Sequence, residues 1–152
     1  MSDKEALERI WTLMQEIGVA MMVTHSSKGG AMRARPMGAI PERHDDTIYF
    51  FTDAETPKDH EIAGDSQVCL IFADTAHKRY VSLAGTAEVR ADPEIVARYW
   101  NDGLRAFWEG PHDPRLRVIR VTPDHGEFWE EPNYNATFVS MAKHGEKAKL
   151  RM

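Results

Sequence analysis

The chain has 152 residues, of which 42% are hydrophobic, and it carries a formal net charge of −5. This length suits one compact domain over residues 1–152, and the apolar content is sufficient for a core. The acidic balance argues against a nucleic-acid partner, because phosphate-backbone binding depends on clustered Lys and Arg. No apolar run is long enough to span a membrane and the charged N-terminal segment does not read as a signal peptide, so the expected location is the cytoplasm.

The first predicted element is an amphipathic helix near the N-terminus. Ser2 and Glu5 have the spacing of a capping box, and Gly18 is suited to end the helix. Apolar side chains recur between them at helical spacing: Leu7, Ile10, Trp11, Met14 and Ile17.

Three strands are predicted next in the chain. The runs VAMMVTH (19–25) and AMRARPMGAI (31–40) flank the turn-forming segment SSKGG, so they predict a hairpin. TIYFFTD (47–53) predicts the third strand, and TPKDHEIAGD (56–65) predicts a short helical turn after it.

The middle of the chain predicts two strands and a helix. QVCLIFAD (67–74) and RYVSLAGTAEVRA (79–91) are rich in strand-forming residues. DPEIVARYWNDG (92–103) predicts a helix, in which Asp92 is the N-cap and Pro93 is the first helical residue.

The last predicted strands are RLRVIRVTP (115–123) and HGEFWEE (125–131), whereas the final twenty residues predict no single element. Six or seven strands, few helices and mostly short connections are typical of a mainly β protein with flanking helices. We therefore predict a small antiparallel barrel.

Common catalytic and metal-binding motifs are absent from the sequence. The seven His residues form no HxH, HxxxH or HExxH pair, so no metal site is predicted. The lack of GxSxG, Walker and GxGxxG motifs argues against a dedicated hydrolase or a Rossmann enzyme. Cys69 stands alone in an apolar run and predicts a buried structural thiol. The sequence therefore identifies no catalytic residue.

The strand over residues 31–40 carries two unusual cations. Period-two alternation puts Arg33, Arg35 and Met37 on one face, where an Arg side chain needs an anionic partner. Pro36 has no N–H to donate, which predicts an edge strand or a bulge.

A second cation stands at the predicted start of the helical turn. Thr56 and Asp59 have capping-box spacing, Pro57 suits the first helical position, and Lys58 falls in the first turn. Helix N–H groups, a Lys and an Arg fork together suit a phosphate group. The same residues fit equally well two surface cations beside an ordinary helix start.

The order of five short motifs resembles one known family. The segments RARPM, YFFTD, TPK, RYVSLAGTAEV and RVTPDHGEFWE follow one another as in the general stress protein 26 group of the pyridoxamine 5′-phosphate oxidase-like flavoproteins. The resemblance covers roughly residues 5 to 131. It implies a six- to seven-stranded antiparallel split β-barrel, with FMN in a cleft at the two-fold interface of a homodimer.

The resemblance also assigns residues to the flavin. Arg35 matches the Arg that starts the flavin-contacting segment, so residues 36–38 run beside the ring system. Phe51 and Thr52 match the aromatic-threonine pair that closes the third strand. The residues assigned in this way are Pro36, Met37, Gly38, Phe51 and Thr52.

Further matches concern the phosphate and the edge of the ring. Lys58 matches the phosphate-binding Lys beside Thr56, although Pro57 stands where the oxidases have a second basic residue. Tyr80 replaces a Gln that reaches the flavin, and Trp129 matches a Trp of the FMN site. An ordinary core position for Trp129 remains the alternative.

The aromatic content provides a separate argument for a dimer. The chain has more large aromatic side chains than a barrel of this size is expected to enclose, and interfaces favour them. The residues concerned are Trp11, Trp100, Phe107, Trp108 and Trp129.

One departure from the family concerns the substrate. The oxidases follow the EFW motif with an Arg-Leu-His type segment that holds the vitamin B6 phosphate, and here the chain continues EEPNYNATFVSMAKH. We therefore expect an FMN-dependent oxidoreductase that does not oxidise pyridoxamine phosphate and whose substrate the sequence does not identify. The alternatives are an F420-dependent reductase and a non-enzymatic module that stores or binds flavin or haem.

Overall fold

The structure is a computed structural model that describes residues 1–25, 30–54, 62 and 66–142. These residues form eight antiparallel strands and two α-helices. The strands are β1 (Val19–His25), β2 (Met32–Gly38), β3 (Ile40–Glu42), β4 (Thr47–Asp53), β5 (Gln67–Asp74), β6 (Arg79–Arg90), β7 (Leu116–Trp129) and β8 (Thr137–Ser140). The helices are α1 (Asp3–Ile17), α3 (Pro93–Tyr99) and the short 3₁₀ helix η1 (Asp102–Ala106).

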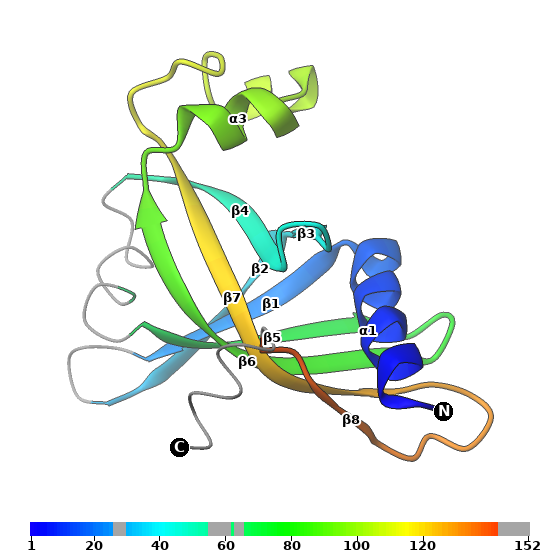
Figure 1. The fold of residues 1–152 in the computed structure, drawn as a ribbon. Helices are drawn as coiled ribbons and strands as arrows, with labels where there is room; N and C mark the ends of the chain where they lie inside the picture. The colour runs from blue at the N-terminus through cyan, green and yellow to red at the C-terminus, as the bar shows by residue number, and fades with distance from the viewer. Residues whose placement is uncertain (26–29, 55–61, 63–65, 143–152) are drawn as a thin grey trace.

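The strands make one curled sheet in the order β2-β1-β5-β6-β7-β4-β3, and β8 pairs with β7. Figure 1 shows α1 against this sheet, and α3 set apart above the upper ends of β4, β6 and β7. The predicted split-barrel fold is confirmed. Strand β2, which contains Pro36, ends the sheet as the missing donor predicted.

Helix α1 has the predicted caps. Ser2 Oγ accepts from the Glu5 N–H and Glu5 Oε1 accepts from the Ser2 N–H, while Gly18 ends the helix in the left-handed conformation with φ of 77°. The apolar face is buried in the main core, together with side chains from the concave face of the sheet. The largest buried members are Trp11, Phe50, Phe72, Phe128, Ile10, Leu13 and Met14.

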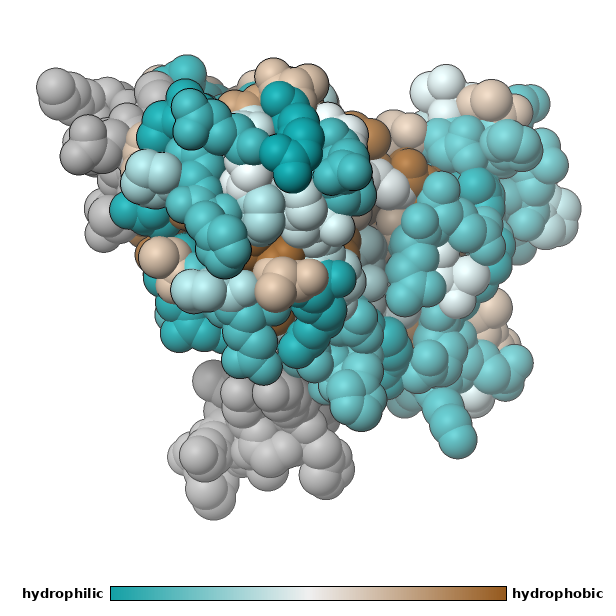
Figure 2. Space-filling view, turned by 90° about the horizontal axis from the view of Figure 1, so that it is seen from above, coloured by the Kyte–Doolittle hydropathy of each residue, from teal (hydrophilic) through white to brown (hydrophobic). Residues whose placement is uncertain are grey.

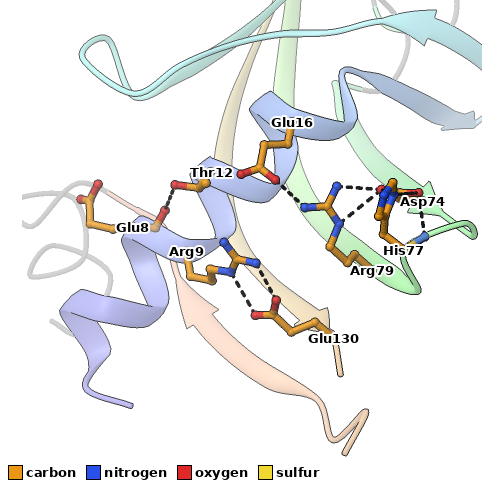
Figure 3. A network of polar contacts seen from close by, with 8 residues as sticks. All are labelled: Glu8, Arg9, Thr12, Glu16, Asp74, His77, Arg79 and Glu130. Atoms are coloured by element: carbon orange, nitrogen blue, oxygen red, sulfur yellow. Dashed lines mark hydrogen bonds and ion pairs between the residues drawn. The ribbon is translucent and has the colours of Figure 1, made fainter. Parts of the chain in front are cut away.

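Ion pairs hold α1 in position at the rim of the barrel (Figure 3). Arg9 makes a two-pronged contact with Glu130, in which Nε and Nη2 lie 3.0 and 2.6 Å from the two carboxylate oxygens. Arg79 donates to Glu16 of the helix and to Asp74, whose pKa it lowers to about 2. These pairs are partly buried, and they join α1 to the end of β7 through Glu130 and to the start of β6 through Arg79.

Two predicted strand boundaries differ from those in the structure. The run 31–40 divides into β2 and β3, and 115–123 and 125–131 are one continuous strand, β7. Strand β7 stays paired with β6 through an irregularity at Ala84 and Gly85, so the polar residues that suggested a break do not interrupt it. In the unassigned C-terminal region, Thr137–Ser140 form β8.

The predicted helix over 92–103 is shorter than expected. Asp92 caps it as predicted, since its Oδ1 accepts from the Ile95 N–H at 3.2 Å. The helix ends at Tyr99, because Trp100 is extended and Asn101 caps the following 3₁₀ helix by accepting from the Gly103 N–H. Side-chain capping by Asn competes with continuation of a helix.

A second, smaller core lies between α3 and the sheet. It contains Tyr49, Ile95, Val96, Trp108, Leu116 and Val118. Strand β4 therefore has apolar contacts on both of its faces, which explains the nearly continuous apolar run TIYFF. Among the described residues, no helix combines the length and apolar character needed to cross a membrane.

Gly126 of β7 lies directly against Ile10 of α1, so we predict that Gly126→Ala destabilises the protein. An added Cβ would lie 2.9 Å from Ile10 Cδ1 and 3.1 Å from Leu83 Cβ. Overpacking of this kind lowers the free energy of unfolding by about 1–3 kcal/mol. Urea denaturation measures the change. The control is Gly38→Ala, where a Cβ would meet nothing within 4 Å; equal stability of the two variants would contradict the prediction.

Candidate functional site

A cleft of about 500 Å³ opens where the chain passes from β2 to β3. The end of β2 and the start of β3 form one side of the cleft, and the end of β4 forms the other side. The α3–η1 region forms its roof. The residues that line it are Pro36, Met37, Gly38, Ala39, Ile40, Phe51, Thr52, Asp53, Tyr99, Asn101, Leu104, Phe107 and Trp108. This volume is in the range of small-molecule sites.

Five of the residues assigned to the flavin line this cleft together. Pro36, Met37 and Gly38 come from β2, and Phe51 and Thr52 come from β4. Met37 packs against the main core, and the space beside Gly38 is open, so a ligand can approach the backbone there. Residues from opposite ends of the curled sheet thus meet at one site.

The roof of the cleft is fixed to β4 by one strong hydrogen bond. Trp108 Nε1 donates to Asp53 Oδ1 at 2.6 Å, and the indole is buried. Phe51 meets the Trp108 ring edge to face, with centroids 6.4 Å apart, and Phe107 lies 5.8 Å from it. Such pairs stabilise the arrangement beyond the area that they bury.

Two further anchors hold the roof. The buried carboxylate of Asp113 accepts from the Glu109 and Arg115 N–H groups at 2.9 Å, and the Arg115 guanidinium contributes most to holding the pKa of Asp113 well below its usual value. Tyr99 donates to Glu42 of β3; burial, followed by this hydrogen bond, raises the Tyr99 pKa. Tyr99 therefore presents a neutral ring to the cleft.

No roof residue was assigned to the site from the sequence. Trp100, Phe107 and Trp108 served only as evidence for a dimer, together with Trp11 and Trp129. That argument does not hold for Trp11 and Trp108, which are 2% and 7% exposed within their own chain. The cluster of aromatic residues over 99–108 was the available signal.

Other predicted site residues lie elsewhere. Arg35 is half-buried and its Nη2 is 3.4 Å from Oγ1 of Thr24, outside the lining of the cleft. Thr56 and Lys58 lie outside the described residues. Tyr80 and Trp129 face each other across β6 and β7 and do not line the cleft of their own chain.

Tyr80 and Trp129 belong to the convex side of the sheet, which we call the outer sheet face. On this face, Met21 of β1 pairs with Ile71 of β5, and Ile71 pairs with Ser82 of β6. It carries several exposed apolar side chains, with the exposed fraction in brackets: Val19 (53%), Met21 (37%), Ile71 (40%) and Phe138 (76%).

The position of Cys69 differs from the prediction. It was predicted to be buried, but it is only half-buried on the outer sheet face, with its Sγ 3.9 Å from Ser82 Oγ. Its neighbours in β5, Val68 and Leu70, supply the buried positions of the strand. The apolar run QVCLIFAD therefore has apolar residues on both faces.

The surface that faces the viewer in Figure 2 is mostly hydrophilic. Seen from above in Figure 2, hydrophobic atoms show mainly as small areas recessed between hydrophilic side chains. Apolar lining in a cleft and an apolar sheet face are therefore local features, and each is a candidate for contact with another molecule.

Sequence comparisons point to one family. A family model described as pyridoxamine 5′-phosphate oxidase like matches residues 5–150. Protein bli-3 of Neurospora crassa is 30% identical over an alignment of 112 residues, which covers 67% of this chain and 54% of that protein. The chain thus spans about half the length of this curated relative.

Solved structures with the same fold agree. General stress protein 26 from Bacillus anthracis has a TM-score of 0.75 at 22% identity, over 88% of this chain and 97% of that one. A general stress FMN/FAD binding protein from Xanthomonas citri has a TM-score of 0.73 at 28% identity, over 86% of this chain and 92% of that one. The resemblance to the general stress protein 26 group, drawn from short motifs, is confirmed.

Proposed function

The chain belongs to the pyridoxamine 5′-phosphate oxidase-like family, and on this premise we propose that it is a homodimeric FMN-dependent oxidoreductase. The observation that carries the proposal is the meeting of five flavin-assigned residues, Pro36 to Gly38 with Phe51 and Thr52, in one cleft. A bound flavin supplies the redox chemistry, and the protein supplies binding and orientation.

The cleft suits a flat, uncharged ring system. Its walls are mostly apolar, and Gly38 allows a ring to approach the backbone. Thr52 adds a hydroxyl group at the end of β4, where a ring with nitrogen and oxygen atoms needs hydrogen-bond partners.

The phosphate is assigned to Arg35, Thr56 and Lys58. Arg35 directly precedes the cleft residues of β2, and Lys58 follows the end of β4, the strand on the opposite side of the cleft. A lysine with N–H groups at a helix start suits a phosphate, and an Arg fork adds two-pronged contacts.

The outer sheet face is where a second copy would bind. It exposes apolar side chains on several strands, as expected for a surface that is covered in a dimer. It also carries Tyr80 and Trp129, which the resemblance assigns to the flavin but which do not line the cleft of their own chain. In the proposed dimer these two residues approach the cleft of the other copy.

The absorbance spectrum of the purified protein distinguishes this proposal from its alternatives. Flavin bands support it, and mass spectrometry of the ligand released by denaturation separates FMN from F420. A Soret band supports a haem module instead, and absence of FMN binding on titration excludes the proposal.

We predict that Arg35→Ala and Lys58→Ala each weaken FMN binding about tenfold or more, because each removes a charge-assisted contact worth about 1.5–3 kcal/mol. Fluorescence titration of FMN with the apoprotein measures the affinity. Lys78→Ala is the control, since Lys78 is exposed and lies 4.0 Å from Glu131, away from the cleft. Unchanged affinity in both test variants would contradict the assignment.

We predict that the protein is a dimer and that Ile71→Glu converts it to a monomer, because the charge falls in the middle of the outer sheet face. Light scattering should give twice the mass of one chain for the unmodified protein, and FMN affinity should fall in the variant. Ala97→Glu, on the exposed side of α3, should change neither. A monomeric unmodified protein would overturn the dimer.

We predict that the FMN-loaded protein does not oxidise pyridoxine 5′-phosphate at a useful rate. The Arg-Leu-His type segment is missing after Trp129, and residues 137–140 return as β8 to pair with β7. Loss of productive orientation removes a rate contribution of about 7–11 kcal/mol in favourable cases. In anaerobic mixing, dithionite should bleach the flavin and pyridoxine 5′-phosphate should not; rapid bleaching by the latter would show that the protein is an oxidase.

A further inference from the structure

The roof of the cleft has features that the flavin assignment does not use. Phe107 lines the cleft and yet is 68% exposed, which is unusual for a Phe beside a buried Trp. It stands directly after η1 and next to Trp108, whose position is fixed by Asp53. The roof thus combines a firmly held aromatic ring with one that is still open to a ligand.

The charge of the cleft lining restricts what can bind under this roof. Asp53 is the charged residue among the described lining residues, and no Arg or Lys is part of that lining. The Asp53 carboxylate already accepts from the Trp108 indole. Against the described part of the lining, an anionic group would meet the Asp53 carboxylate and no cationic side chain, which is costly.

The polar groups of the roof favour an acceptor on the ligand. The Oδ1 atom of Asn101 accepts from the Gly103 N–H, so the group that its side chain can offer is the amide NH₂. Tyr99 directs its hydroxyl to Glu42 and leaves its ring for the cleft. The roof therefore offers aromatic rings and one neutral donor.

We propose that the α3–η1 roof, with Phe107 as its main contact, binds the substrate, and that the substrate is a planar, uncharged aromatic compound with a carbonyl group. This substrate class rests on the proposed function, because the flavin-assigned residues occupy the opposite walls of the same cleft. Aromatic pairs prefer stacked or edge-to-face contacts, and Phe107 and Trp108 present such surfaces side by side.

Calorimetric titration of the FMN-loaded protein tests the proposal with two probes of the same shape, 2-naphthamide and 2-naphthoate. We expect the neutral amide to bind about tenfold more tightly than the carboxylate. Phe107→Ala should weaken amide binding about tenfold, which corresponds to about 1.4 kcal/mol. Tyr134→Ala, which removes another exposed aromatic side chain away from the cleft, should leave amide affinity unchanged.

Three results would overturn the proposal: equal or tighter binding of 2-naphthoate, no detectable binding of 2-naphthamide, or an amide affinity that Phe107→Ala does not change. Titration with FMN distinguishes failure of the flavin assignment from failure of the substrate proposal. If FMN itself does not bind, the proposed function fails, and the same two probes titrated into the flavin-free protein still show whether the roof prefers the neutral ring.

Discussion

Strand β2 contains a proline that has no N–H to donate, and the sheet ends at this strand. Strands β2 and β3 stand at the two ends of the strand order, yet Ala39 alone separates them in the chain, so the segment that pairs with β1 continues directly into pairing with β4. Residues 36–40, where this change of partner takes place, line the cleft. The change of partner strand is therefore the condition for the site.

Two separate cores support the elements around the cleft. Helix α1 fills the concave side of the sheet and passes close to Gly126, so the lower part of the barrel is tightly packed. The second core, around Trp108 and Val118, joins α3 to the opposite side of β4 and β7. Because β4 is packed on both faces, its end, which carries Phe51, Thr52 and Asp53, is a rigid support for the cleft.

Local patterns predicted the elements well where they depend on neighbours in sequence. The capping box of Ser2, the end at Gly18, the N-cap at Asp92 and the strands 19–25, 47–53 and 67–74 are as expected. The patterns did not predict the roof, because the contact of Trp108 with Asp53 joins residues far apart in the chain. The continuity of β7 likewise depends on its pairing with β6, and burial of Trp11 depends on how the sheet curls around α1.

The roof is inserted between two strands that pair with each other along almost their whole length, since Arg90 at the end of β6 faces Val118 near the start of β7. Residues 91–115 are thus a long excursion within what is otherwise a simple hairpin, with most of their apolar contacts gathered in a core of their own. Such an arrangement is modular. A change within residues 91–115 would therefore alter the roof of the cleft while leaving the packing of α1 against the sheet in place.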